Sequence, residues 1–209
     1  MATNWPNSVQ TFTNPTASSA LNSPSHADQH ATVNDTVEAL QQYAGLVLVK
    51  VQQAGTAVSS LTITNCFSST FTNYLLTMTG GTFNTANTQA RARLVSGSTP
   101  VTTGYKSRLL YSLYGASTPL AASSTQGYVL WWGGTKANAT APVFGRLHIF
   151  GPFLTDGTFF TSDAYGTDVA AGNSTAYHST PASYNGIEVL PEFGTMTGCT
   201  FRVYGYNNG

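Results

Sequence analysis

The fold is decided around residues 33–51, VNDTVEALQQYAGLVLVKV, because the hydrophobic period of the chain changes at Gly45. Before this glycine, apolar residues recur at the heptad spacing of a helix that buries one face. From Leu46 onward, β-branched residues and a period of two predominate, as in β-strands. The sequence therefore predicts a short helix followed by β-structure that continues to the end of the chain.

The helix is predicted over residues 25–45. Ser25 follows a proline and precedes Asp28 by three positions, which resembles an N-terminal capping box with a shorter acid. Residues 27–44 contain neither glycine nor proline, and Gly45 lies where a C-terminal cap is expected. The helix has fewer than three heptads and is too short to be a stable coiled coil alone, so flanking domains must hold it.

One apolar line runs along this helix. It consists of Val33, Val37, Leu40 and Ala44. A single helix cannot bury such a line, so we expect it to pack against partner helices. Residues 46–51 could prolong the line through Val47 and Val51, but Gly45 and the valine content favour a strand.

Nine short segments after the helix are predicted to be strands: 46–51, 61–63, 74–78, 90–95, 107–114, 128–132, 144–150, 187–190 and 201–206. Turn signals lie between them at Gly80-Gly81, Ser96-Gly97, Gly133-Gly134, Asp156-Gly157 and Asn185-Gly186. No helical pattern interrupts the series. Residues 46–209 are therefore expected to form an antiparallel β-sandwich or jelly-roll-like head.

Residues 1–24 are rich in Pro, Thr, Asn and Ser, and their large apolar groups are Trp5, Phe12 and Leu21. Such a segment cannot build a core of its own. It is either a disordered tail or an extended arm that becomes ordered when the three apolar groups dock onto a neighbouring protein. Isolated aromatic residues in a polar tail favour the arm.

Composition excludes several classes of protein. Charged residues make up 8% of the 209 residues, against about 25% in an ordinary soluble domain, which suits dense packing beside other chains. The formal net charge is zero and no basic stripe is present, so nucleic acid is not an expected partner. No apolar run reaches the roughly 18 residues of a membrane span, and the first residues lack the layout of a signal peptide, so we expect synthesis and folding in a cytosol without membrane insertion.

Several segments resemble tail and fibre proteins of tailed bacteriophages. They are SHADQH at residues 25–30 with the helix that follows, CFSSTFTNY at 66–74, FGPFL at 150–154 and GCTFRVYGY at 198–206. Their order along the chain is a stronger signal than any one of them. The resemblance covers most of residues 25–209.

The resemblance implies a homotrimer with an N-terminal part attached to the virion and a β-sandwich displayed outward. The number three rests on this resemblance alone. A virion protein made in the bacterial cytoplasm, acting as a tail fibre or spike in host attachment, is the favoured function. A capsid decoration or head fibre protein is the first alternative, and a carbohydrate-binding module is the second.

His26 and His30 lie on the same helix face as the apolar line. In a trimer they would form either an axial polar layer that fixes register or a metal site, and the polar layer is favoured. No metal or other cofactor is expected. The two cysteines, Cys66 and Cys199, are expected to be buried thiols rather than a disulfide.

Catalysis is not expected, because no motif of a known catalytic site is present. Asp163 and Asp168 flank Tyr165-Gly166 and could supply paired carboxylates or a weak calcium loop, but two solvated loop acids are the favoured interpretation. Arg91 and Arg93 share one face of their strand, which we interpret as a solvated face.

Trp131 and Trp132 are the candidate glycan contacts. Neighbouring strand residues point to opposite faces, so one of the two is expected in the core and the other outside. An outward tryptophan could stack on a sugar ring or pack against another subunit, and subunit packing is favoured.

Overall fold

The computed structural model describes residues 26–43, 45–125, 127–130, 132–134, 140–166 and 170–207. Within them the chain forms an α-helix, α1 (His26–Tyr43), followed by β-structure, which confirms the mainly β prediction. The chain divides into two compact units. The first contains α1, and the second comprises residues 48–206.

Helix α1 begins and ends within the predicted range of 25–45. Asp28 lies in its first turn, where a negative charge is favourable beside the positive end of the helix dipole. Within the described residues, no helix combines the length and the apolar composition that a bilayer crossing requires.

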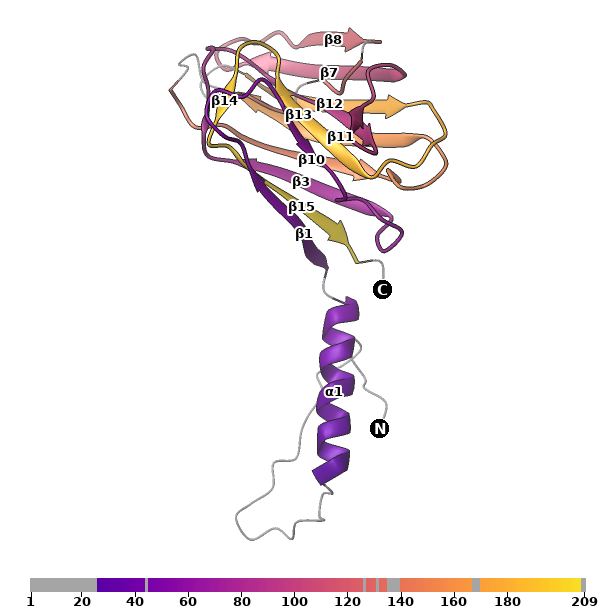
Figure 1. The fold of residues 1–209 in the computed structure, drawn as a ribbon. Helices are drawn as coiled ribbons and strands as arrows, with labels where there is room; N and C mark the ends of the chain where they lie inside the picture. Colours follow the sequence, from indigo (N-terminus) through magenta and orange to yellow (C-terminus); the bar gives the residue numbers. More distant parts are fainter. Residues whose placement is uncertain are drawn as a thin grey trace. The chain divides into compact units, whose positions relative to one another are not determined.

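The second unit consists mainly of two antiparallel sheets, and Figure 1 labels most strands of the larger sheet and β13 of the smaller one. The larger sheet has the order β1 (Leu46–Gln53), β15 (Thr200–Tyr206), β3 (Asn73–Thr79), β10 (Phe144–Phe150), β11 (Thr158–Gly166), β12 (Ala170–His178), β7 (Tyr105–Leu113) and β8 (Leu120–Ser124), with β9 (Gly133–Gly134) paired to β10. The smaller sheet has the order β2 (Leu61–Ile63), β13 (Gly186–Pro191), β5 (Ala90–Ser96) and β6 (Thr99–Pro100). A short separate pair joins β14 (Met196–Thr197) to β4 (Thr82–Phe83).

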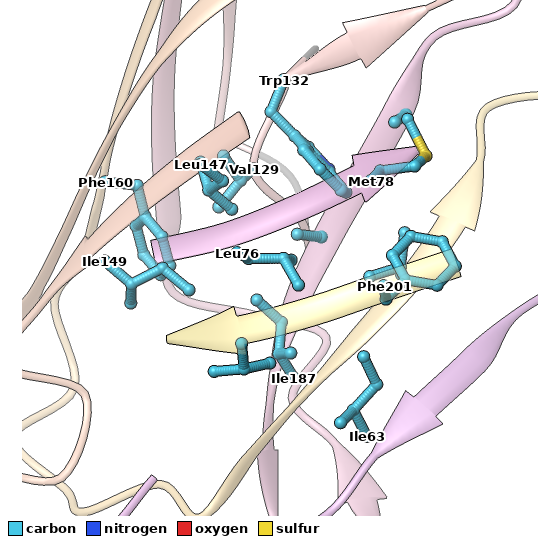
Figure 2. Close-up of a cluster of buried hydrophobic side chains, with 14 of the residues drawn as sticks. Ile63, Leu76, Met78, Val129, Trp132, Leu147, Ile149, Phe160, Ile187 and Phe201 are labelled. Carbon is cyan, nitrogen blue, oxygen red and sulfur yellow. The ribbon is translucent and has the colours of Figure 1, made fainter. Parts of the chain in front are cut away.

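The two sheets share one hydrophobic core, which gives the unit a sandwich-like architecture (Figure 2). Strict alternation builds this core: β3 buries Tyr74, Leu76 and Met78, whereas the residues between them lie on the outer face. From the smaller sheet, Ile63 and Ile187 point into the same cluster. The alternation fixes which residues of the larger sheet remain outside.

The predicted strand 128–132 is wrong. None of its described residues belongs to a named strand, and Val129 forms an isolated bridge to Ala92. Val129 lies in the main core and the next residue, Leu130, lies in a second cluster with Leu109, so consecutive side chains are both buried. A pleated strand cannot bury neighbouring side chains on one face, and this segment instead supplies two clusters.

Gly133-Gly134 does not form the predicted turn, because these glycines form β9 against β10. Gly133 faces Gly145 in the register. A Cβ atom on Gly133 would lie 2.5 Å from the carbonyl oxygen of Phe144. The glycines therefore permit a close approach of two backbones rather than a reversal of the chain.

The hairpin β11–β12 was not predicted from the sequence. Its strands contain Gly, Ala, Ser and Asn, which have low β-propensity. Strand pairing compensates for this low β-propensity, because β12 is hydrogen-bonded to β11 on one side and to β7 on the other over its whole length. At Gly172 the backbones come so close that a Cβ atom would lie 2.0 Å from the carbonyl oxygen of Leu110.

Cys66 and Cys199 are buried free thiols, as predicted. Burial raises the pKa of Cys66 to about 12 and that of Cys199 to about 11. Both groups are therefore protonated and chemically inert at neutral pH.

The close approach at Gly133 provides a stability test. Gly133→Ala places a methyl group against backbone atoms, so we expect the free energy of unfolding to fall by about 1–3 kcal/mol. Gly55→Ala is the matched control, because its Cβ atom would meet only a methyl group of Val58, at 3.7 Å. Urea unfolding of both variants measures the difference, and equal stabilities would contradict the proposed role of Gly133.

Candidate functional site

The outer face of the larger sheet exposes a row of aromatic side chains across three strands. Phe150 of β10 is opposite Phe159 of β11, and Phe159 is opposite Tyr177 of β12. Phe159 is 55% exposed and Phe150 is 37% exposed. Alternate residues of these strands point into the core, so the aromatic rings between them lie on the opposite face of the sheet and do not contribute to the core.

A shallow groove of about 400 Å³ lies at one end of this row. We call it the outer groove, and it crosses β11, β12, β7 and the residues at the end of β8. Its lining residues are Lys106, Ser107, Arg108, Ser123, Ser124, Thr125, Phe159, Thr175, Ala176 and Tyr177. Its volume is within the range of pockets that bind small molecules.

The aromatic end of the outer groove is held in place by packing. The rings of Phe159 and Tyr177 have centroids 4.6 Å apart and an interplanar angle of 32°. The Tyr177 ring also lies over Gly157, where a Cβ atom would come within 2.3 Å of it. Gly157 thus leaves the space that the tyrosine ring occupies.

Two cations lie beside the aromatic pair. Lys106 is opposite Tyr177 in the register, and Arg108 is opposite Thr175 on one side and Ser123 on the other. Both cations are exposed, and neither forms an ion pair with a described residue. The outer groove therefore combines an aromatic surface, hydroxyl groups and positive charge that no described carboxylate neutralises.

A contact between a histidine and a tyrosine lies on the same face of the sheet, outside the outer groove. The hydroxyl of Tyr206 is 2.7 Å from Nδ1 of His148, and the His148 ring stacks between the rings of Tyr206 and Phe150. Burial and the neighbouring Arg146 cation lower the pKa of His148, and Asp163 opposes this effect. His148 is therefore mainly neutral at pH 7, as suits a ring packed between aromatic groups.

Trp132 is fully buried and its ring centroid is 6.4 Å from that of Phe201. It packs in the core (Figure 2) and cannot contact a ligand at the surface, so this residue is removed from the predicted glycan contacts. Trp131 lies outside the described residues. The exposed aromatic residues Phe159 and Tyr177 were missed because their hairpin was not recognised as strands.

The apolar line on α1 is exposed in the single chain. Val33 is 47% exposed, and Val37 and Leu40 are each 46% exposed. Ala44 and the side chain of His26 lie outside the described part of the chain, as do the predicted anchor residues Trp5, Phe12 and Leu21. His30 is exposed. The packing of this helix against partner helices stays a prediction.

The predicted solvated arginine face on β5 is wrong. Arg91 forms an ion pair with Glu192 and lies 4.0 Å from the ring centroid of Tyr128. Arg93 forms an ion pair with Glu188 at 3.2 Å and donates from Nε to the carbonyl of Gly127. The segment that follows β8 covers this face, and the arginines stabilise its position.

Three described acidic residues of the β unit, Glu188, Glu192 and Asp163, each pair with a different arginine. Asp163 accepts hydrogen bonds from Arg146 and from Nδ2 of Asn173, and Asp168 lies outside the described residues. Among the described residues, no cluster of three or more His, Cys, Asp or Glu side chains has the geometry of a metal site.

Comparison with models of known protein families, and with curated protein sequences, gave no match.

The histidines of the β unit predict a pH dependence of stability. Burial lowers the pKa of His178, although its hydrogen bond to the carbonyl of Thr103 opposes this effect, and the pKa of His148 is also lowered from the ordinary value of 6.5. The unfolded chain then binds more protons than the folded chain as the pH falls below about 6.5. We therefore expect the free energy of unfolding to fall between pH 7.5 and pH 5.5.

Urea unfolding at these two pH values measures this change. His148→Gln should make the change smaller, because it removes one of the two groups with a lowered pKa. Phe193→Ser is the control, because it changes an exposed side chain and removes no titratable group, so it should leave the change as it is. A free energy of unfolding that rises on acidification would contradict the assignment.

Proposed function

We propose that this chain is a trimeric fibre or spike protein of a tailed-phage virion and that it attaches the particle to the host surface. The sequence resemblance to phage tail and fibre proteins supports the class of protein. The observation that carries the attachment role is the outer groove, an exposed site on the larger sheet with aromatic, hydroxyl and cationic side chains. Binding, rather than catalysis, is the proposed activity.

The exposed apolar line on α1 supports assembly. Three side chains of similar exposure, Val33, Val37 and Leu40, follow one another at heptad spacing on one helix face. Burial of apolar surface is the main favourable contribution to most protein association. In the proposed trimer these side chains form the centre of a short helix bundle, with His26 and His30 as a polar layer.

Trimer formation supplies the mechanism of attachment. Three copies present three outer grooves, and several fibres on one particle present more. After one groove binds, the others bind at a high effective concentration, so weak sites together give strong attachment. Residues 1–24 are proposed to be the arm that joins the fibre to other virion proteins.

The oligomeric state tests the helix assignment. We expect the intact chain to be a trimer at micromolar concentration and Val37→Asp to shift it toward monomer, because the variant would bury three carboxylates together. Ala31→Asp is the control, since it adds the same charge at an exposed position away from the apolar line. Sedimentation equilibrium measures the mass, and a stable monomeric wild-type chain would contradict the proposal.

Competition with infection tests attachment. The purified full chain should bind susceptible cells and reduce infection by the phage, since it occupies the host receptor. Particles that lack the protein should attach poorly. Normal infection by such particles would instead favour a capsid decoration protein, whose role requires no host contact.

A further inference from the structure

We infer that the ligand of the outer groove is an acidic saccharide. This inference rests on the proposed attachment function and names the chemical class of the receptor. It follows from three features of the groove that occur together, namely an aromatic surface, two cations without an ion-pair partner among the described residues, and a border of hydroxyl groups.

The aromatic pair provides the surface on which a sugar ring packs. Phe159 is 55% exposed and adjoins Tyr177, whose ring is fixed over Gly157. The C–H groups on one face of a pyranose ring are apolar and pack against the negative face of an aromatic ring. Because the two rings are already positioned, little side-chain entropy is lost when the sugar binds.

The cations provide the charge selectivity. Lys106 is opposite Tyr177 on the neighbouring strand, and neighbouring strands lie about 4.8 Å apart. Arg108 is two residues further on the same face, a rise of about 7 Å along the strand. An anionic group on a ring that packs against Tyr177 is therefore within reach of both side chains. The planar guanidinium of Arg108 is suited to bind a carboxylate through two hydrogen bonds.

The hydroxyl groups match the remainder of a saccharide. Ser123, Thr125 and Thr175 line the same groove. Each hydroxyl both donates and accepts hydrogen bonds, as sugar hydroxyls do. A groove of about 400 Å³ accommodates a short oligosaccharide rather than a long polymer surface.

A single-stranded nucleic acid is the other ligand with stacking surfaces and negative charge. Its binding sites follow the phosphate backbone with a series of cations. The outer groove has two cations, Lys106 and Arg108, and the whole chain has a net charge of zero. The acidic saccharide therefore fits the charge and the extent of the groove better.

The test is isothermal titration calorimetry of the full-length protein with oligogalacturonate and hyaluronate oligosaccharides. A neutral galactose oligomer of equal length and an oligothymidylate serve as comparison ligands. We expect at least one acidic saccharide to bind more tightly than both comparison ligands, and its affinity to fall as salt rises, because salt screens the contacts with Lys106 and Arg108.

Variants of the groove locate the site. Lys106→Gln and Arg108→Gln should each weaken binding of the acidic saccharide about tenfold, the effect of one lost charge-assisted hydrogen bond. Arg202→Gln is the matched control, because Arg202 lies on the same face of the sheet in β15 and outside the groove. Phe159→Ser should abolish the packing surface, and Phe193→Ser is its control at a residue that is 61% exposed.

Gly157→Ala tests the positioning of Tyr177 without removing any groove side chain. The added methyl group would occupy the space of the Tyr177 ring, so binding should weaken although both cations remain. Thermal unfolding of each variant confirms that the fold is retained. Tyr177→Phe keeps the ring and should bind like the wild type, which separates a packing role from a hydrogen bond.

The results of these experiments distinguish failure of this inference from failure of the proposed function. Equal or tighter binding of the neutral oligomer or of oligothymidylate, or no binding of either acidic saccharide, overturns the inference. If the chain still competes with infection in that case, the attachment function stands. Acidic-saccharide binding that depends on Arg108, with no effect on infection, supports the inference and overturns the attachment function. Binding unaffected by the groove variants places the saccharide elsewhere and overturns the assigned site.

Discussion

The burial of alternate side chains between the two sheets is the constraint on which the rest of the structure depends. Strands β3, β10 and β15 each direct one set of side chains into the shared core, for example Leu76, Leu147 and Val203. Apolar burial is the main favourable contribution to folding, and a slip of one residue would exchange the two faces of a strand. The core therefore determines the outer face as strictly as the inner one.

The outer face is informative because it contains aromatic residues that the core does not require. Phe159 and Tyr177 expose ring surface to water although their neighbours in sequence, Phe160 and Ala176, already fill the interior. Contiguous exposed apolar surface on a folded protein commonly marks a site of interaction. Ligand binding is the use that the adjoining cations and hydroxyl groups favour.

Charged residues are few in this protein, so the contacts of each one are informative. The chain has eight basic and eight acidic residues. Among the described residues, three ion pairs connect neighbouring strands or segments of the β unit. Arg91 and Arg93 also contact the segment after β8, through the Tyr128 ring and the carbonyl of Gly127. Lys106 and Arg108 form no ion pair with any residue that the structure describes, so we infer that their positive charge is available to a ligand in the outer groove.

The sequence by itself determined the helix and most strands, because their signals are local. These signals are the heptad spacing of Val33, Val37 and Leu40 and the two-residue alternation of the strands. The sequence also indicated that both cysteines are buried thiols. Only the tertiary structure decided the hairpin β11–β12, whose weak strand formers are held by pairing on both sides, and the use of Gly133 for backbone contact rather than a turn. The same applies to the outer groove. Phe159 and Tyr177 belong to one hairpin, and only the long-range pairing of β12 with β7 places Lys106 beside them.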